Sequence, residues 1–260
     1  MFHGFAQCQD VFIEVALQYA LNGFIVHLID FEGFGFSGGK RITSLRIFNM
    51  HKQVMTLLSQ VRPDLPLFLF GHSMGSLVLN SFLCLNPDIA ERLAGVMYSG
   101  PLYGIPDFKA IDPVKKEVLK LLSLAIDEFV INMEIPLHKV TRNRNQHMSV
   151  LQTQKGAPLA SLGFMVSVLR MQDLVHAKAK STTYPYLMIL GEKDVIVNNR
   201  VNREWHAKTQ SKVKKIKLMV GAYHELTKEP NNHSLFEASL SFMGERLVGK
   251  APGTPVKPFG

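Results

Sequence analysis

The sequence predicts an α/β fold in which a mostly parallel sheet is covered by helices on both faces and carries an inserted helical cap. Three observations lead to this prediction. Short apolar runs alternate with helical patterns as far as residue 100, which is the order of a parallel sheet with crossover helices. The alternation stops over residues 101–180 and resumes after residue 181. We therefore assign residues 1–100 and 181–248 to one core and residues 101–180 to the cap.

The composition is that of a globular protein with a full hydrophobic core. The 260 residues are 47% hydrophobic, and no run of about 20 uncharged apolar residues indicates a transmembrane helix. Residues 1–5 lack the basic start and apolar core of a signal peptide. Cys8 and Cys84 are too few for a disulfide framework and show no metal-ligand spacing with histidine. We expect buried thiols in a reducing compartment, and hence a cytoplasmic protein without a metal site.

The net charge of +8 is compatible with an anionic partner. The basic residues are scattered rather than interleaved with aromatic ones, so no nucleic-acid binding is expected. Lysines at positions 212, 214, 215 and 217 surround the predicted strand at residues 213–220. We interpret them as charges that protect an edge strand from pairing. The alternative is contact with anionic lipid head groups, which together with an apolar cap predicts peripheral membrane contact.

The elements near the N-terminus follow in order from local patterns. Apolar positions at helical spacing predict a helix over residues 10–21, and Asn22-Gly23 is a natural stop. The apolar run at residues 24–29 is typical of a parallel strand covered on both faces. Helical spacing next predicts a helix over residues 42–61, before Pro63.

The remaining elements are predicted on the same grounds. Strands are expected at residues 67–70, 93–99, 184–190 and 213–220, and helices at residues 114–133, 161–173, 199–208 and 232–248. The cap is expected to hold helices and no strand, because a structureless insertion of that length is improbable in a compact domain. The tail at residues 249–260, rich in proline and glycine, is expected to be disordered.

One pentapeptide, Gly71-His72-Ser73-Met74-Gly75, stands between an apolar run and a helical pattern that extends to Leu85. This context is typical of a nucleophile elbow. A strand that reverses into a helix within a few residues forces Ser73 into a strained conformation and leaves room only for glycine at positions 71 and 75. The pentapeptide alone is weak evidence, but its context makes Ser73 a candidate nucleophile.

A serine nucleophile needs a base to accept its proton and an acid to orient that base. Asp194 follows one predicted strand and His224 follows the next, so both are expected at the carboxyl edge of the sheet, where ligands bind in such folds. Their order after the serine is also the order found along hydrolase chains with this elbow. We therefore predict Ser73, Asp194 and His224 as the catalytic residues.

Other histidines and acids are weaker candidates. His72 is adjacent to the nucleophile, but neighbouring side chains on a sharp turn diverge, so we expect it to orient nearby structure. Glu192 is the nearest competitor of the predicted acid, and Glu225 directly follows the predicted base. Asp30 also ends a predicted strand, but it precedes the serine and breaks the chain order.

Two backbone amides are predicted to bind the oxyanion of a reacting ester. The N–H of Met74, at the start of a helix, points to the place where that charge would form. The second donor is expected from the loop after the strand that precedes the first helix. Here that donor is Phe5, because Gly4 allows close backbone approach. We expect His3 to shape the loop.

The glycine-rich loop Gly33-x-Gly35-x-x-Gly38 resembles a dinucleotide fingerprint only in its spacing. No apolar helix opens directly after it, and no acidic residue ends a second strand about 20 residues on. A nucleotide site is therefore not predicted.

Several motifs together carry a resemblance to a known family. They are His3-Gly4-Phe5, Asp30-x-x-Gly33-x-Gly35-x-Ser37, the pentapeptide around Ser73, Thr141-Arg142-Asn143, Gly191-x-x-Asp194 and Gly221-Ala222-Tyr223-His224. From residue 2 to about residue 245 the chain resembles α/β-hydrolases of the monoacylglycerol lipase and lysophospholipase group, also described as serine aminopeptidase-like. The resemblance implies the α/β-hydrolase fold, the triad Ser73, Asp194 and His224, the oxyanion donors Phe5 and Met74, and a structural turn at residues 33–37.

The chain departs from this family at three places. The family has a hairpin and a full strand before the His-Gly pair, so its N-terminal strands are expected to be missing from this sequence, which puts the Phe5 donor in doubt. Ser76 stands where close relatives often have a second glycine. The cap matches poorly outside residues 141–143, and the cap selects the substrate.

The sequence thus predicts a serine hydrolase that cleaves carboxylic esters through an acyl-enzyme on Ser73. Its substrate is expected to be a small-molecule acyl ester, such as a monoacylglycerol- or lysophospholipid-like lipid, and no cofactor is needed. Acyl transfer or amide cleavage by the same triad is one alternative. A catalytically silent scaffold is the other, because the shortened N-terminus could disrupt the oxyanion hole.

Overall fold

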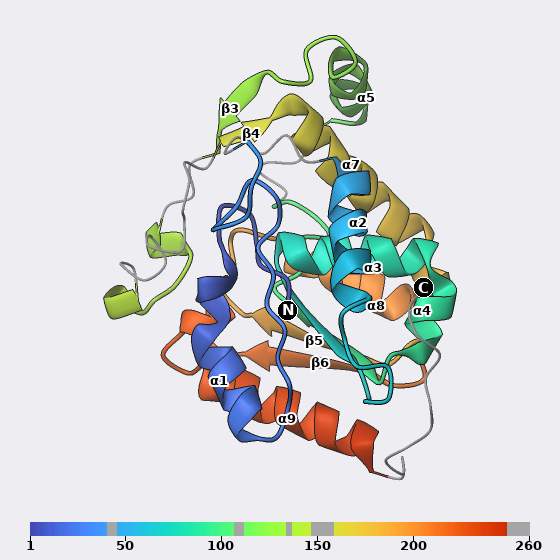
Figure 1. The fold of residues 1–260 in the computed structure, drawn as a ribbon. Coiled ribbons are helices and arrows are strands. Elements are labelled where there is room, and N and C mark those ends of the chain that lie inside the picture. Colours follow the sequence, from blue (N-terminus) through green and yellow to red (C-terminus); the bar gives the residue numbers. More distant parts are fainter. Residues whose placement is uncertain (41–45, 107–111, 134–136, 147–158, 249–260) are drawn as a thin grey trace.

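The computed structural model describes residues 1–40, 46–106, 112–133, 137–146 and 159–248 (Figure 1). Its central sheet has four parallel strands in the order β1-β2-β5-β6. These are β1 (Phe68–His72), β2 (Gly95–Ser99), β5 (Tyr186–Gly191) and β6 (Lys214–Met219). Strands β2 and β5 are buried along their whole length, which explains their continuous apolar sequence. The predicted parallel sheet is confirmed.

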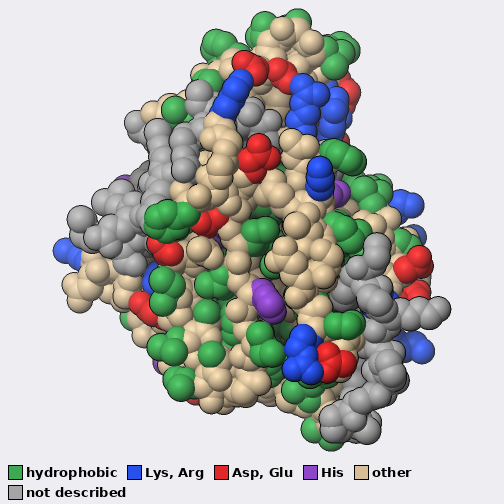
Figure 2. All heavy atoms as spheres, viewed as in Figure 1, with side chains coloured by type: hydrophobic (Ala, Val, Ile, Leu, Met, Phe, Trp, Pro, Cys, Tyr) green, Lys and Arg blue, Asp and Glu red, His purple; other side chains and the backbone are tan. Residues whose placement is uncertain are grey.

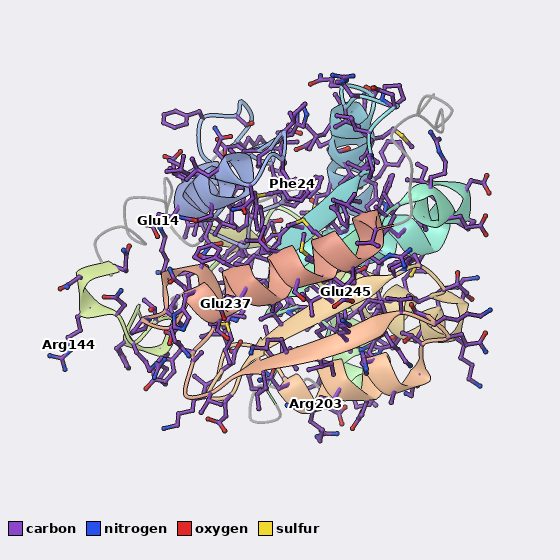
Figure 3. The ribbon with its side chains drawn as sticks, turned by 90° about the horizontal axis from the view of Figure 1, so that it is seen from below. Glu14, Phe24, Arg144, Arg203, Glu237 and Glu245 are labelled. Atoms are coloured by element: carbon purple, nitrogen blue, oxygen red, sulfur yellow. The ribbon has the colours of Figure 1, made fainter. Side chains whose placement is uncertain are left out.

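Helices cover both faces of the sheet. The helices of the described residues are α1 (Ile13–Leu21), α2 (Ile47–Leu58), α3 (Met74–Leu85), α4 (Pro87–Arg92), α5 (Pro113–Leu122), α7 (Leu162–Ala177), α8 (Asn199–Lys208) and α9 (His233–Leu247). Of these, α5 lies away from the sheet and contacts α7 (Figure 1). Figure 3 shows α9 with Glu237 and Glu245 on one side of the strands, and α8 with Arg203 on the other.

The two layers of the core follow the alternation of side chains along the strands. Phe70, Met97 and Ile189 pack with residues of α1 and α9. Tyr98 is next to Met97 and Met188 is next to Ile189, so their side chains point to the opposite face of the sheet. There they pack with residues of α2, α3, α7 and α8. The sheet is therefore buried on both faces, as its apolar strands require.

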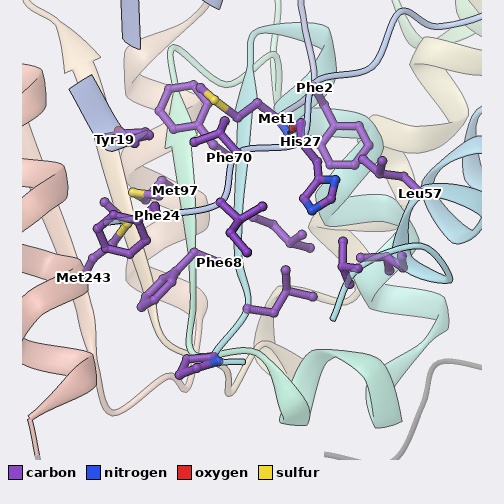
Figure 4. Close-up of a pocket in the computed structure, with 17 residues that line it drawn as sticks. Met1, Phe2, Tyr19, Phe24, His27, Leu57, Phe68, Phe70, Met97 and Met243 are labelled. Carbon is purple, nitrogen blue, oxygen red and sulfur yellow. Dashed lines mark hydrogen bonds between the residues drawn. The ribbon is translucent and has the colours of Figure 1, made fainter. Parts of the chain in front are cut away.

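The predicted strand at residues 24–29 is wrong. In its place the structure has a single parallel bridge between Phe2 and Ile29, while Phe2 also bridges Gly71. Phe2 N–H donates to Phe70 O at 2.9 Å, and His72 N–H donates to Phe2 O at 3.0 Å. A strand needs a hydrogen-bonding neighbour along its length. Among the described residues, only Met1, whose amino group donates to His27 O at 2.6 Å, and Phe2 bond this segment on the side of β1. Beyond that point Phe24 and other apolar side chains line a pocket beside β1 (Figure 4).

The prediction that the cap holds no strand is also wrong. Strands β3 (Val130–Asn132) and β4 (Leu159–Ser161) form an antiparallel pair. The predicted helix 114–133 ends at Leu122 as α5, and the chain then turns into β3. Both strands are only three residues long and far apart in sequence, so no local pattern reveals them. The helix α7 leads from β4 back over α3 (Figure 1).

Most other boundaries agree with the predictions within a few residues, and α8 agrees at both ends. A 3-10 turn (Gln9–Phe12) replaces the start of the predicted helix 10–21, and the short α4 was not predicted. The first four residues of the predicted helix 42–61 and the predicted tail at residues 249–260 lie outside the described residues. Within the parts of the chain that the structure describes, no helix has the length and apolar character needed to cross a membrane.

Strand β6 is the edge strand that its lysines indicated. Lys214 Nζ donates to the backbone oxygens of His206 and Thr209 at the end of α8, at 2.9 and 2.7 Å. Lys215 pairs with Glu245 of α9 at 2.6 Å. Two of the four lysines thus bind neighbouring elements rather than only protecting an edge.

Candidate active site

Ser73 occupies the tight turn between β1 and α3. Its φ of 51° and ψ of −115° lie where residues with a β-carbon rarely occur, as a nucleophile elbow requires. Its N–H donates to Ser99 O at 2.9 Å, which ties the turn to the end of β2. A β-carbon on Gly71 would lie 2.7 Å from Ser76 N, so the turn requires glycine there.

The three predicted catalytic side chains lie in one hydrogen-bonded line. His224 Nε2 lies 2.9 Å from Ser73 Oγ, and His224 Nδ1 lies 2.7 Å from Asp194 Oδ2. An ionised carboxylate can only accept, so Nδ1 carries the hydrogen and Nε2 is left to accept from the serine hydroxyl. His224 therefore has the tautomer in which its Nε2 can accept the Ser73 proton.

Parallel strands bring these residues together although they are far apart in sequence. Ser73 follows β1, Asp194 follows β5 and His224 follows β6, all at the carboxyl edge of the sheet. A β-carbon on Gly191 would overlap the carbonyl oxygen of Tyr223. The loop that carries His224 therefore lies directly against the end of β5.

The acid of the line is fully buried and held by its own loop. Asp194 Oδ1 accepts the N–H groups of Ile196 at 2.8 Å and Val197 at 3.1 Å, and its side chain has no exposed area. These two bonds fix the carboxylate so that its other oxygen faces His224.

The electrostatic surroundings favour the protonated form of His224. Burial by itself would lower the pKa of this imidazole, but the charge and hydrogen bond of Asp194 and the charge of Glu225 outweigh it. The pKa of His224 is therefore raised above its ordinary value, which strengthens the base and stabilises the imidazolium it becomes.

The two predicted oxyanion donors belong to residues next to Ser73 in sequence and next to Gly4, which packs on Ser73. Among the described residues, neither the N–H of Phe5 nor that of Met74 has a hydrogen-bond partner. Gly4 packs against Ser73: a β-carbon on Gly4 would lie 3.2 Å from Ser73 Cβ. The Phe5 ring stacks on Phe164 of α7 with centroids 5.4 Å apart, so the cap borders the site at this point.

The competing residues are used elsewhere in the structure. Glu192 accepts the N–H of Gly221 at 2.8 Å. Asp30 accepts the N–H groups of Gln9 and Phe36 and so closes its own glycine-rich loop. His3 Nε2 accepts the N–H of Phe31 at 3.0 Å, and burial lowers its pKa to about 4.

A buried polar network that was not predicted from the sequence lies beside the three predicted catalytic residues. Glu225, considered only as a neighbour of the base, contacts both Gln7 and His72. The one signal in the sequence is that an acidic residue directly follows the predicted base. Within the described residues no group of three or more histidine, cysteine or acidic side chains is placed to hold a metal ion.

Comparisons with known proteins place this chain in a family. The model of the family described as "Serine aminopeptidase, S33" matches residues 1–231. A monoacylglycerol lipase of Mycolicibacterium smegmatis is 23% identical over 254 residues, which cover 94% of this chain and 87% of that protein. The mouse monoglyceride lipase is 26% identical over 259 residues, covering 92% of this chain and 80% of the relative.

Solved structures show the same fold. The monoacylglycerol lipase of Paleococcus ferrophilus superposes with a TM-score of 0.84 at 21% identity, covering 94% of this chain and 93% of that one. A monoglyceride lipase of Saccharomyces cerevisiae, solved with a substrate analogue, superposes with a TM-score of 0.82 at 17% identity, covering 94% and 86% of the two chains. Since the family match spans most of the sequence, the chain has the α/β-hydrolase fold and belongs to the serine aminopeptidase S33 family.

Proposed function

We propose that this protein is a serine esterase that hydrolyses carboxylic esters of lipids through an acyl-enzyme on Ser73. The observation that carries the proposal is the hydrogen-bonded line from Ser73 through His224 to Asp194 at the carboxyl edge of the sheet. The family match and the lipases and esterases among the relatives support the same reaction class.

The proposed reaction begins with attack of Ser73 Oγ on the ester carbonyl. His224 Nε2 takes the hydroxyl proton and returns it to the departing alcohol, while Asp194 stabilises the imidazolium. The N–H groups of Phe5 and Met74 hold the oxyanion, and each such donor lowers the barrier by roughly 3 kcal/mol. Water, deprotonated by His224, then cleaves the acyl-enzyme to release the acid. No cofactor takes part in this scheme.

The proposed substrates are monoacylglycerol- or lysophospholipid-like lipids. Two of the relatives above are named monoacylglycerol or monoglyceride lipase, and a further relative, from Bacillus subtilis, is named phospholipase. The stacked rings of Phe5 and Phe164 give the nucleophile an apolar neighbour on the cap side, as an acyl chain would need.

We also propose peripheral membrane contact through the cap. Figure 2 shows hydrophobic side chains at the cap end of the molecule, together with basic and acidic ones. Val114, Leu121, Leu124 and Phe129 are each more than half exposed there. Co-sedimentation with vesicles of anionic phospholipid at low salt, weakened at high salt, would support this contact. No binding at low salt would remove it.

The central experiment compares the wild type with Ser73→Ala on a medium-chain p-nitrophenyl ester. The wild type is expected to hydrolyse the ester and to be labelled at Ser73 by a fluorophosphonate probe, and Ser73→Ala is expected to do neither. Ser241→Ala, an exposed serine on α9, is the matched control and should behave as wild type. Ester hydrolysis that survives in Ser73→Ala would reject the proposal.

Amide cleavage by the same residues is the second candidate, because the family description names aminopeptidases. Hydrolysis of aminoacyl p-nitroanilides faster than of acyl esters would favour it. A well-folded protein that the probe does not label would instead support a catalytically silent scaffold.

A further inference from the structure

A fully buried carboxylate lies directly after the predicted base. Glu225 has no exposed side-chain area, and its N–H donates to Val140 O at 2.8 Å. Its Oε1 accepts the hydroxyl of Thr227 at 2.6 Å, and its Oε2 accepts the amide of Gln7 at 2.5 Å. A buried charge is retained only where it is paired and hydrogen-bonded, so each of these contacts holds Glu225 in place.

Gln7 connects this carboxylate to the loop of the predicted oxyanion donor. Its Nε2 donates to Glu225, and its Oε1 accepts the N–H of Gly4 at 3.0 Å. A carboxylate can only accept, so it forces the donor end of the Gln7 amide toward itself. The acceptor end is thereby fixed on Gly4, the residue before Phe5.

The same carboxylate oxygen also faces the residue before the nucleophile. His72 Nε2 lies 3.0 Å from Glu225 Oε2, and His72 Nδ1 lies 3.1 Å from Ser99 O. That Ser99 oxygen also accepts the N–H of Ser73. Burial would raise the pKa of Glu225, but His72, Thr227 and Gln7 together lower it to about 2, so the group stays an acceptor throughout the range of activity.

We propose that Glu225 is a positioning residue that fixes the amide of Gln7 and, through Gly4, holds the N–H of Phe5 in place for the oxyanion. This inference rests on the proposed ester hydrolysis. Glu225 touches neither substrate nor reacting atoms; it joins the loop of the base, the residue before the nucleophile and the oxyanion loop.

Two kinds of variant test the role. Glu225→Ala leaves the Gln7 amide without its acceptor and is expected to lower kcat roughly 10- to 100-fold with little change in KM, since the removal of a whole donor costs about 10²- to 10³-fold. Gln7→Glu replaces the amide donor by a second carboxylate, which cannot donate to Glu225 and is repelled by it. This variant should lose activity to a similar extent at pH 8. The double variant Gln7→Glu/Glu225→Gln restores a donor opposite an acceptor and should return kcat to within about fivefold of wild type.

Glu229→Ala is the matched control. Glu229 is equally buried and also follows His224 in sequence, but it pairs with Arg142 at 2.6 Å. It should lower the Tm while leaving kcat within about threefold of wild type. If Glu225→Ala does not fold, the rescue of Gln7→Glu by Glu225→Gln decides the question.

Amide hydrogen exchange gives a readout that does not depend on activity. Exchange in a peptide covering residues 1–8 should be faster in Gln7→Glu than in the wild type and slow again in the double variant. Wild-type kcat in a folded Glu225→Ala, or a double variant no better than Gln7→Glu, would overturn the inference. If the wild type hydrolyses no ester, the proposed function fails, and the exchange rates still decide whether this network holds Gly4.

Discussion

Gly75, in the first turn of α3, lies so close to Phe2 that a β-carbon on it would overlap the Phe2 carbonyl oxygen; the same atom would lie 2.7 Å from His3 O. At this point the start of the helix and the N-terminal segment pack backbone against backbone. This contact sets the spacing between the N–H of Met74 and the loop that carries Phe5.

Gly75→Ala is expected to lower kcat on a p-nitrophenyl ester by roughly 100-fold, because a displacement of about 1 Å in a reacting group can cost that much. The measurement is kcat together with the rate of fluorophosphonate labelling. Gly244→Ala is the control: a β-carbon there meets nothing within 4 Å, so this variant should keep full activity and gain about 0.5–1 kcal/mol of stability. Equal activity of the two variants would contradict the argument.

Asp194→Asn is expected to lower kcat by roughly 10⁴-fold, as loss of the acid does in serine proteases. The asparagine keeps an oxygen for Ile196 and Val197 but can present an N–H toward His224, which favours the wrong tautomer. Glu192→Gln serves as the control because Glu192 bonds Gly221 instead of the base. A larger loss in Glu192→Gln than in Asp194→Asn would assign the acid to Glu192.

The pH dependence of kcat/KM should show an acid limb with its midpoint above pH 6.5. The pKa of His224 is raised, and only the neutral imidazole can accept the Ser73 proton, so activity is lost as the pH falls through the raised value. Asp194→Asn removes a principal cause of the increase and should move the limb to lower pH. A wild-type midpoint at or below pH 6 would show that burial outweighs the two carboxylates.

The elements that the sequence predicted well are those with a strong local pattern. Strands β2 and β5 are continuous apolar runs, and α8 has an Asn198 cap whose side chain accepts two N–H groups of the first turn. Asp194 and His224 could be selected because strand topology places the ends of β5 and β6 at one edge.

The features that were missed depend on distant partners. The apolar run at residues 24–29 has the pattern of a strand, but pairing depends on the segment beside it. Among the described residues only Met1 and Phe2 bond it there. Strands β3 and β4 are too short to leave a pattern. Gln7 and Glu225 are 218 positions apart, and neither residue type indicates the other.

Arg142, in the segment predicted to be the cap, binds Glu229 in the segment predicted to be the core: its Nε lies 2.6 Å from Glu229 Oε2, and its N–H donates to Glu229 Oε1 at 2.8 Å. The Glu229 side chain is fully buried, so Arg142→Ala would leave a buried carboxylate with only the backbone bond. We expect a clear fall in Tm, measured by calorimetry. Arg62→Ala breaks an ion pair between exposed side chains, with Asp64, and should leave the Tm unchanged. Equal Tm values for both variants would show that the Arg142 contact contributes no more than a surface pair.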